Sequence, residues 1–131
     1  MMFVLDTNTL VFFFKGMGQV ANNLLLHSPK DIGIPAIVVY ELEVGIGKST
    51  SPAKRTKQLA EMVSVVNVLP FDTFEAKAAA QIRVALETKG EPIGPYDVLI
   101  AATAIANQAT LITHNTNEFS RIENLLLEDW F

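Results

Sequence analysis

The chain contains no cysteine. Disulfide bonds, thiolate metal sites and cysteine nucleophiles are therefore excluded. Long hydrophobic runs are also missing: the longest apolar stretch, residues 98–105, is far shorter than the roughly 20 residues that a membrane-spanning helix needs. The first residues lack the basic start and long apolar segment of a secretory signal. We therefore expect a soluble, cytoplasmic protein with no membrane partner.

Basic residues are in short supply as well. Lys and Arg total 10 against 14 Asp and Glu, which leaves a formal net charge of −4. Most proteins that bind nucleic acid carry a basic surface, so the overall charge does not favour such a partner. The balance is less unfavourable if several acids share a bound cation, because the cation reverses the local charge.

What is present is the composition and size of one globular domain. The 131 residues are 50% hydrophobic and 18% charged, with no internal repeat and no low-complexity segment. A chain of this length can build a hydrophobic core without covalent or metal cross-links. We expect a single domain over residues 1–131, with some apolar surface available to a partner.

Short apolar runs alternate with helical periodicities along the chain. The runs predict strands at residues 2–5, 32–34, 66–69, 110–113 and 125–127. The periodicities predict helices at residues 8–15, 20–27, 36–48, from 52 onward, across 74–86 and at 95–107. In the helix across 74–86, the stripe expected to face the core is Phe74, Ala78, Ile82, Ala85 and Leu86. The alternation predicts an α/β fold with a mainly parallel sheet covered on both faces.

Polar residues stand where predicted strands end and helices begin. Asp6 directly follows the first strand, and Asn115 follows the 110–113 strand by two residues. Asp97 lies in the first turn of the helix that starts at Pro95. Functional sites of parallel sheets form at the carboxyl ends of the strands. The positive end of the helix dipole favours the charged form of Asp97, which we therefore expect to be ionised.

Each acid also has a purely structural interpretation. Asp6 suits a turn or a helix N-cap, and Asp97 is an ordinary first-turn acid. Glu118 can be a loop or cap acid. Glu41 and Glu43 lie about 200° apart on a helix, so only one of them can face a shared site. Physical reasoning leaves the choice between these two open.

A shared site of such acids would suit a hard divalent cation. Mg²⁺ prefers a few carboxylate oxygens and keeps several waters. Bound Mg²⁺ acidifies a water and polarises a phosphodiester, and it relieves the repulsion among clustered carboxylates. Sequence spacing alone does not show that residues 6, 41, 97 and 118 converge.

Four segments in order resemble the motifs of VapC-type PIN-domain ribonucleases, the toxins of VapBC toxin–antitoxin pairs. The segments are FVLDTN at 3–8, ELEVGIGKS at 41–49, IGPYDVLIAA at 93–102 and ATLITHNTNEFSRI at 109–122. The ending LEDW at 127–130 is similar to the family's usual ending. The resemblance extends from about Met2 to Trp130. A single segment is a weak signal, whereas all of them in order at fitting intervals are a strong one.

The resemblance implies a three-layer α/β/α PIN fold and assigns metal binding to Asp6 and Asp97. It selects Glu41 over Glu43, because the family's acid stands four residues before the motif glycine, here Gly45. It also implies that Thr7 and Asn8 orient Asp6 by hydrogen bonds.

The fourth motif departs from the family pattern. Many PIN proteins have Asp where this chain has Asn115, which offers a carbonyl oxygen but no charge. Glu118 is the candidate for the missing acid. We therefore expect one Mg²⁺ and leave a second open. Mn²⁺ is an alternative, since both ions take oxygen ligands.

The function implied by the resemblance is a Mg²⁺-dependent endoribonuclease acting on tRNA or another structured RNA. Asp6, Glu41, Asp97 and Glu118 would form its catalytic centre. The implied partners are a VapB-type antitoxin, a second copy of the chain in a homodimer, and operator DNA bound only through the antitoxin.

Two other functions fit part of the same pattern. Haloacid-dehalogenase-like phosphatases carry Asp-x-Asp-x-Thr after a first strand, but this chain has Asn8 and Leu10 at the last two positions, and Asn8 cannot be the general acid. A catalytically degenerate PIN domain that only binds partners is favoured by Asn115 and opposed by the retained acids. For His114 and for the basic cluster at 54–57, an exposed surface position is favoured over RNA contact.

Overall fold

The structure, a computed structural model, describes residues 1–131. Its strands are β1 (Phe3–Leu5), β2 (Ile32–Pro35), β3 (Asn67–Leu69), β4 (Thr110–Ile112) and β5 (Leu126–Glu128). Its helices are α1 (Thr7–Lys15), α2 (Val20–Leu24), α3 (Ala36–Gly47), α4 (Pro52–Val65), α5 (Thr73–Thr88), α6 (Pro95–Ala106) and α7 (Thr116–Phe119), with a 3₁₀ turn, η1 (Pro29–Asp31). Every predicted strand and helix is present within a few residues of its expected ends, and only α7 and η1 were not predicted.

All five strands are parallel and form one sheet in the order β3-β2-β1-β4-β5. The central strand β1 pairs with β2 on one side and β4 on the other, and all three of its residues are buried. Strands covered on both faces are expected to be apolar throughout rather than alternating. Because the strands are parallel, their carboxyl ends lie along the same edge of the sheet.

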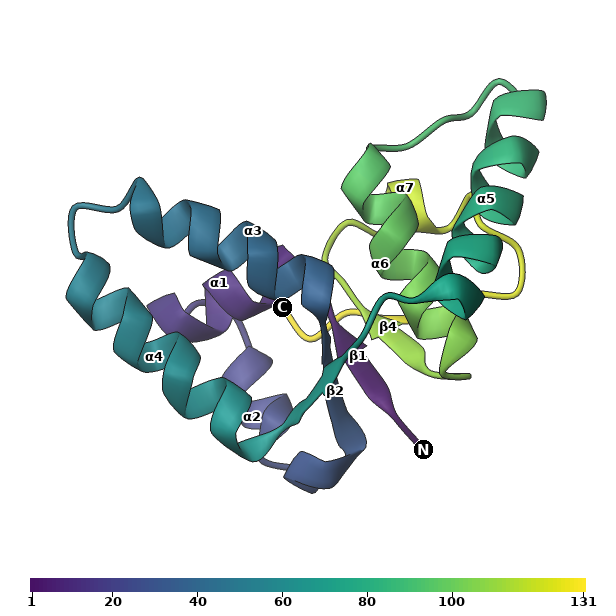
Figure 1. Cartoon of the computed structure of the whole chain (residues 1–131). Coiled ribbons are helices and arrows are strands. Elements are labelled where there is room, and N and C mark those ends of the chain that lie inside the picture. The colour runs from purple at the N-terminus through teal and green to yellow at the C-terminus, as the bar shows by residue number, and fades with distance from the viewer.

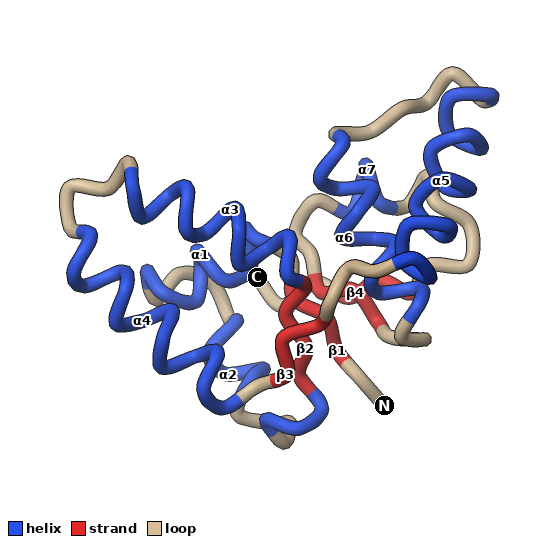
Figure 2. Tube along the Cα trace, in the orientation of Figure 1, coloured by secondary structure: helices blue, strands red, loops and turns tan.

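Helices cover both faces of this sheet. Figures 1 and 2 show α1–α4 on one side of the strands and α5–α7 on the other. The predicted three-layer α/β/α arrangement is therefore confirmed.

Helix α6 is the most buried helix of the molecule. Its buried residues are Val98, Ile100, Ala101, Ala102, Thr103 and Ala104. A helix that is apolar nearly all round is expected to lie in the interior, and α5 packs along it. Asp97 thus belongs to an element that is held firmly against the sheet.

Helix α5 buries only part of the predicted stripe: Ile82 and Leu86 are in the core and Ala78 packs against it. Phe74 is 68% exposed and Ala85 is also exposed, whereas Ala79, Ile82 and Leu86 are buried. The prediction of Phe74 and Ala85 in the core was wrong. The predicted stripe and the observed buried residues both have helical spacing, and packing against α6 determines which residues are buried.

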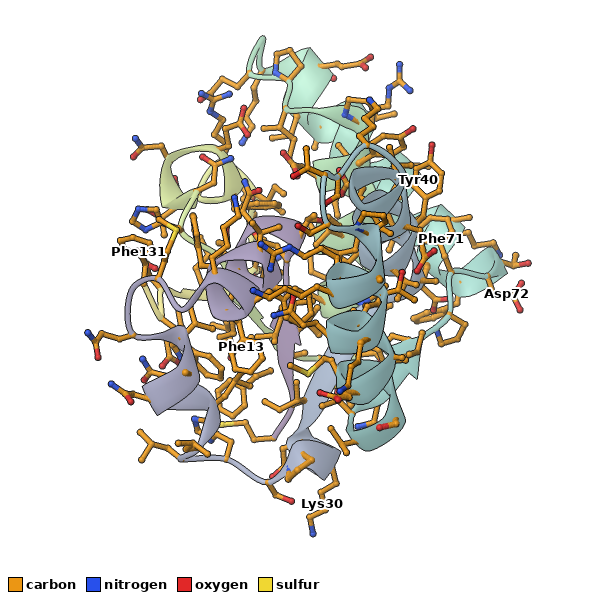
Figure 3. All side chains as sticks on the ribbon, turned by 90° about the vertical axis from the view of Figure 1, so that its left-hand side faces the viewer. Phe13, Lys30, Tyr40, Phe71, Asp72 and Phe131 are labelled. Carbon is orange, nitrogen blue, oxygen red and sulfur yellow. The ribbon has the colours of Figure 1, made fainter.

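The C-terminal residues close the structure near the start of the chain. The Trp130 side chain is buried, and its ring stacks on His27 with centroids 5.3 Å apart. The carbonyl of Phe131 accepts a hydrogen bond of 2.7 Å from the Gln19 amide. In Figure 3, Phe131 lies at the edge of the view and the half-buried Phe13 lies nearer its middle. None of the helices combines the length and apolar character needed to span a membrane.

Candidate active site

The carboxyl edge of the sheet collects the predicted acids from four separate elements. Asp6 directly follows β1, and Glu41, Asp97 and Glu118 belong to α3, α6 and α7. The charges of the other three acids all act on the carboxyl group of Asp97. The fold therefore brings together four side chains that lie far apart in the sequence.

Asp6 is held in place by both β1 and α1. It is the N-cap of α1, and its Oδ1 accepts a hydrogen bond of 2.9 Å from the Thr9 amide. The Thr9 hydroxyl in turn donates to the carbonyl of Ile112 at the end of β4, at 3.1 Å. The N-cap interpretation of Asp6 is thus correct, and it orients the carboxylate at the sheet edge.

Burial raises the pKa of Asp6 above its ordinary value of 3.8. The polar side chains of Thr113 and Thr9 and the hydrogen bond from the Thr9 amide oppose this shift, and the charge of Asp129 adds to it. Only 5% of Asp6 is exposed. A charged carboxylate here is therefore costly unless a cation compensates it.

Glu41 is oriented by a neighbour from a different helix. The Thr7 hydroxyl donates a hydrogen bond of 2.8 Å to Glu41 Oε1, which links the first turn of α1 to α3. Glu43 on the same helix is exposed. The geometry thus places Glu41 rather than Glu43 beside Thr7 and Asp97.

Asp97 is the acid most affected by its surroundings. Burial raises its pKa from 3.8 to about 6, with further contributions from the charges of Glu118, Asp6 and Glu41 and from a hydrogen bond with Glu118. The sequence argument from the helix dipole favoured the charged form of this group. Burial and the neighbouring carboxylates oppose ionisation, but a pKa of about 6 still leaves the Asp97 carboxyl mostly ionised at pH 7, as that argument expects.

Glu118 is paired with Asn115. The Asn115 side-chain amide donates to Glu118 Oε2 at 2.6 Å, and both residues belong to the turn that forms α7. The amide therefore positions the carboxylate of Glu118. The proposed substitution of Glu118 for a missing acid at position 115 is compatible with this contact and stays a prediction.

Two contacts differ from those expected around Asp6. Thr7 donates to Glu41, and Thr9 rather than Asn8 donates to Asp6, while Asn8 is exposed. Sequence reasoning missed the role of Thr9. The signal was the spacing Asp6-x-x-Thr9, in which the third residue after an N-cap supplies the amide that the cap accepts.

His114 belongs to the C-terminal packing. Its Nδ1 lies 2.8 Å from Asp129 Oδ2, and its ring stacks on Phe131 with centroids 4.4 Å apart. These contacts give His114 a structural role at the end of β4.

The donor set of the site fits Mg²⁺ by its chemistry. No three acidic or histidine side chains form a ready-made cage for a metal ion. The four carboxyl groups nevertheless offer hard oxygen ligands, and a cation would relieve the repulsion that raises the pKa of Asp97. None of these acids takes part in either ion pair of the structure. No basic side chain therefore neutralises the carboxylates in place of a cation. Metal binding stays a prediction.

A groove opens beside the acids. It has a volume of about 510 Å³ and lies between α1, α3 and the start of α4. Thr7 and Glu41 line it, and three basic side chains do so as well, namely Lys15, Lys48 and Arg55. The acidic site is therefore continuous with a partly basic surface.

The chain is similar to known proteins over almost its entire length. The PIN domain model matches residues 3–125. Ribonuclease VapC2 of Rickettsia felis is 39% identical over 99% of this chain and 98% of its own length. The tRNA(fMet)-specific endonuclease VapC of Salmonella typhimurium is 35% identical over 98% of this chain and 97% of its own.

Solved structures agree with this likeness. VapBC2 from Rickettsia felis, bound to a DNA fragment from its promoter, matches with a TM-score of 0.91 and 37% identity over 100% of both chains. DNA-bound VapBC from Salmonella typhimurium matches with a TM-score of 0.93 and 35% identity over 100% of this chain and 99% of that one. These matches include every segment that contributes an acid to the site.

Proposed function

The chain belongs to the PIN domain family, among its VapC ribonucleases, and from this premise we propose that it is a Mg²⁺-dependent endoribonuclease that cleaves tRNA. The observation that carries the proposal is the grouping of Asp97 with three other acids whose charges raise its pKa. A carboxylate cluster without a basic partner is well suited to a divalent cation.

In this proposal, Asp6 and Asp97 hold the cation and Glu41 and Glu118 complete the acidic centre. When bound, Mg²⁺ would acidify the attacking water and polarise the phosphodiester. The N-cap bond holds Asp6, the Thr7 hydroxyl holds Glu41, and the Asn115 amide holds Glu118. Such supporting contacts keep the carboxylates in the geometry that the reaction needs. No nucleophile from the protein is required.

We also propose that the protein is the toxin of a type II toxin–antitoxin pair. Two similar structures are VapBC complexes bound to DNA, which supports a VapB-type antitoxin as the partner of this chain. Contact with operator DNA would then run through the antitoxin. A homodimer stays a prediction from the resemblance.

The test is cleavage of an initiator tRNA by the purified protein, with Mg²⁺ and with chelator, in wild type and in Asp6→Asn. Asparagine is as good an N-cap as aspartate, so this variant removes the charge while keeping the start of α1. We expect chelator to abolish cleavage and Asp6→Asn to lower its rate by at least the roughly ten- to hundredfold that loss of an outer-shell partner costs a metal site.

The matched control is Asp72→Asn, the same change at the N-cap of α5, where Asp72 belongs to a capping box and is not among the charges that act on Asp97. It should cleave like wild type. Cleavage that persists undiminished in chelator or in Asp6→Asn would contradict the proposal. The chain is not a haloacid-dehalogenase-like phosphatase, because it belongs to the PIN domain family. If the wild-type protein does not cleave tRNA at all, the alternative of a catalytically degenerate PIN domain that only binds partners is favoured instead.

A further inference from the structure

We propose that the groove between α1, α3 and α4 binds the phosphate backbone of the RNA through Lys15, Lys48 and Arg55. This inference rests on the proposed nuclease function, since it names the surface that leads substrate to the acids. The groove begins at the Thr7–Glu41 pair, so it opens directly onto the acidic centre.

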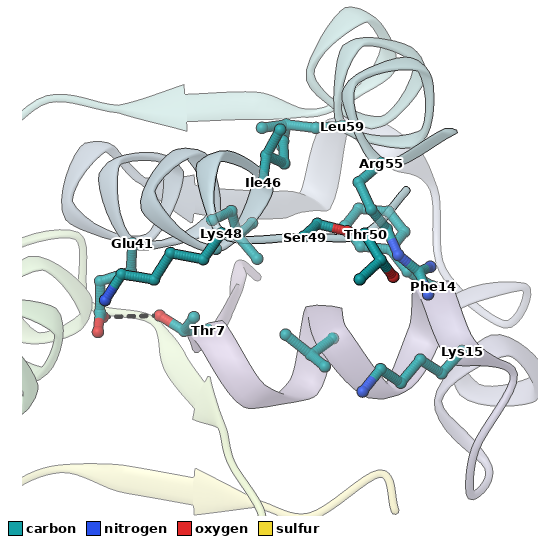
Figure 4. Close-up of a pocket in the computed structure, with 13 residues that line it drawn as sticks. Thr7, Phe14, Lys15, Glu41, Ile46, Lys48, Ser49, Thr50, Arg55 and Leu59 are labelled. Atoms are coloured by element: carbon teal, nitrogen blue, oxygen red, sulfur yellow. Dashed lines mark hydrogen bonds between the residues drawn. The ribbon is translucent and has the colours of Figure 1, made fainter. Parts of the chain in front are cut away.

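The three basic side chains approach the groove from three helical segments. Figure 4 shows Lys48, at the end of α3, directed toward Glu41, with Lys15 and Arg55 farther along. Lys15 ends α1 and Arg55 lies in the first turns of α4. Positive charge is thus spread along the groove rather than gathered at one point.

None of these three side chains has an acidic partner. The two ion pairs of the structure join Arg83 to Glu87 and His114 to Asp129, both outside the groove. Arg55 donates instead to the neutral Gln58 side chain at 2.8 Å, and Gln58 donates to the carbonyl of Phe14 at 3.2 Å. The guanidinium is therefore held at the groove while its charge stays uncompensated, as a phosphate contact requires.

The chain needs such a surface because of its overall charge. With a net charge of −4 and four acids at its centre, the protein repels RNA as a whole. Phosphate contacts supply most of the affinity for nucleic acid and position the strand without reading its sequence. A basic groove beside the acids would attract RNA locally and so offset the repulsion between the acidic protein and its anionic substrate.

The dimensions of the groove suit a strand of several nucleotides. Thr7 and Lys15 stand eight residues apart on α1, which corresponds to about 12 Å at the rise of an α-helix. Along a duplex axis each strand carries one phosphate per about 3.4 Å, so this length corresponds to about three phosphates of a duplex strand and to fewer of an extended single strand. Apolar side chains between the charges, Val11 and Ile46 among them, can contact sugars and bases.

A protein segment is the competing occupant, since the lining includes five hydrophobic residues. RNA is favoured by position, because the scissile phosphate must reach the acids and the groove starts at Glu41. Charge also favours RNA, because the one acidic side chain of the lining is Glu41 itself.

The test measures binding of a fluorescent oligo(U) RNA and of an initiator tRNA in chelator, where cleavage does not interfere. The variant is Lys15→Gln with Lys48→Gln, which keeps most of each aliphatic stem and removes two charges. The matched control is Lys30→Gln with Lys77→Gln, two exposed lysines outside the groove. Arg55→Lys tests separately whether the guanidinium fork is needed, as distinct from charge alone.

We expect the groove variant to bind both RNAs about tenfold or more weakly. We also expect the slope of its log K against log salt to be shallower by about 1.4, since each of the two lost phosphate contacts accounts for about 0.7 on a single strand. The control should keep wild-type affinity and slope. With Mg²⁺, the groove variant should raise KM for the tRNA and leave kcat nearly unchanged, since these contacts bind ground and transition states alike.

Equal RNA affinity in the groove and control variants would overturn the inference. Unchanged RNA binding together with lost binding of a co-expressed VapB-type antitoxin would also overturn it and assign the groove to protein. The proposed function fails separately: RNA bound through the groove but never cleaved with Mg²⁺ would refute the nuclease and leave the groove in place.

Discussion

At the scale of single residues, Asp97 combines a stability cost with a proposed role. Burial and three neighbouring carboxylates raise its pKa to about 6, from 3.8 in an unfolded chain. The folded state therefore binds this proton more tightly than the unfolded state. The contribution of Asp97 to stability is therefore fully present below pH 3.8 and is lost as the pH rises through about 6, where the folded carboxyl ionises.

Asp97→Asn removes this penalty. In chelator, we expect the variant to have a higher Tm than wild type above pH 6, and the difference to shrink as the pH falls toward 4. Mg²⁺ should raise the Tm of wild type but hardly that of the variant, since a ligand stabilises only the state that binds it. Thermal unfolding followed by circular dichroism across pH measures both effects.

Glu43→Gln is the control for this prediction, because it removes an exposed acid from α3. It should show neither the pH-dependent gain in Tm nor the loss of the Mg²⁺ effect. An Asp97→Asn variant that is less stable than wild type at every pH would contradict the raised pKa.

The identity of the candidate acids could be predicted, but their contacts could not. Asp6 and Asp97 were recognisable by their places at a strand end and a helix start. The choice of Glu41 over Glu43 needed a family resemblance, since both lie on one helix. The bond from Thr7 to Glu41 joins residues 34 positions apart, and no local pattern encodes such a pair.

At the scale of elements, two glycines after α1 show how the end of that helix is built. Gly16 (φ 67°) and Gly18 (φ 66°) both adopt the left-handed conformation that favours glycine. A Cβ at Gly16 would meet nothing within 4 Å, whereas one at Gly18 would lie 2.8 Å from the carbonyl oxygen of Phe131. A substitution at Gly16 therefore tests backbone strain alone, whereas one at Gly18 tests strain together with a steric clash against Phe131.

Gly16→Ala should lower the free energy of unfolding by about 1–2 kcal/mol through strain alone. Gly18→Ala should lower it by about 1–3 kcal/mol more, because the new methyl group displaces the C-terminal residue. Urea unfolding of both variants measures the difference. Equal losses in the two variants would show that Phe131 does not pack on this turn.

The elements themselves were largely predictable, and their buried faces only in part. Helix α6 is apolar all round, so its position in the interior followed from composition. The face of α5 was mispredicted at Phe74 and Ala85, because a helix with apolar residues on more than one side has several possible stripes. Packing against α6 selects one of them.

At the scale of the whole molecule, Trp130 joins the end of the chain to its beginning. Its ring stacks on His27 and lies 5.5 Å from the ring of Phe3 in the central strand. Its indole N–H donates to Glu128 at 2.8 Å, so the polar atom is satisfied within the fold. Trp130 is also the only tryptophan of the chain.

Trp130→Ala should lower the free energy of unfolding by about 3–5 kcal/mol, the usual range for a large buried aromatic residue. Trp130→Phe, which keeps a ring against His27, should lose less. Denaturant unfolding followed by circular dichroism tests this, because both variants lack the fluorescent residue. A loss below about 1 kcal/mol in Trp130→Ala would mean that the C-terminal segment contributes little to the folded state.

By itself, the sequence determined that the fold is α/β, where most of its helices and strands lie, and which acids are candidates for a metal site. These properties follow from composition and from patterns within a few residues. Tertiary structure alone decided the strand order, the partners of Glu41 and Asp6, and the raised pKa of Asp97, because each depends on burial and charge contributed by segments remote in the chain.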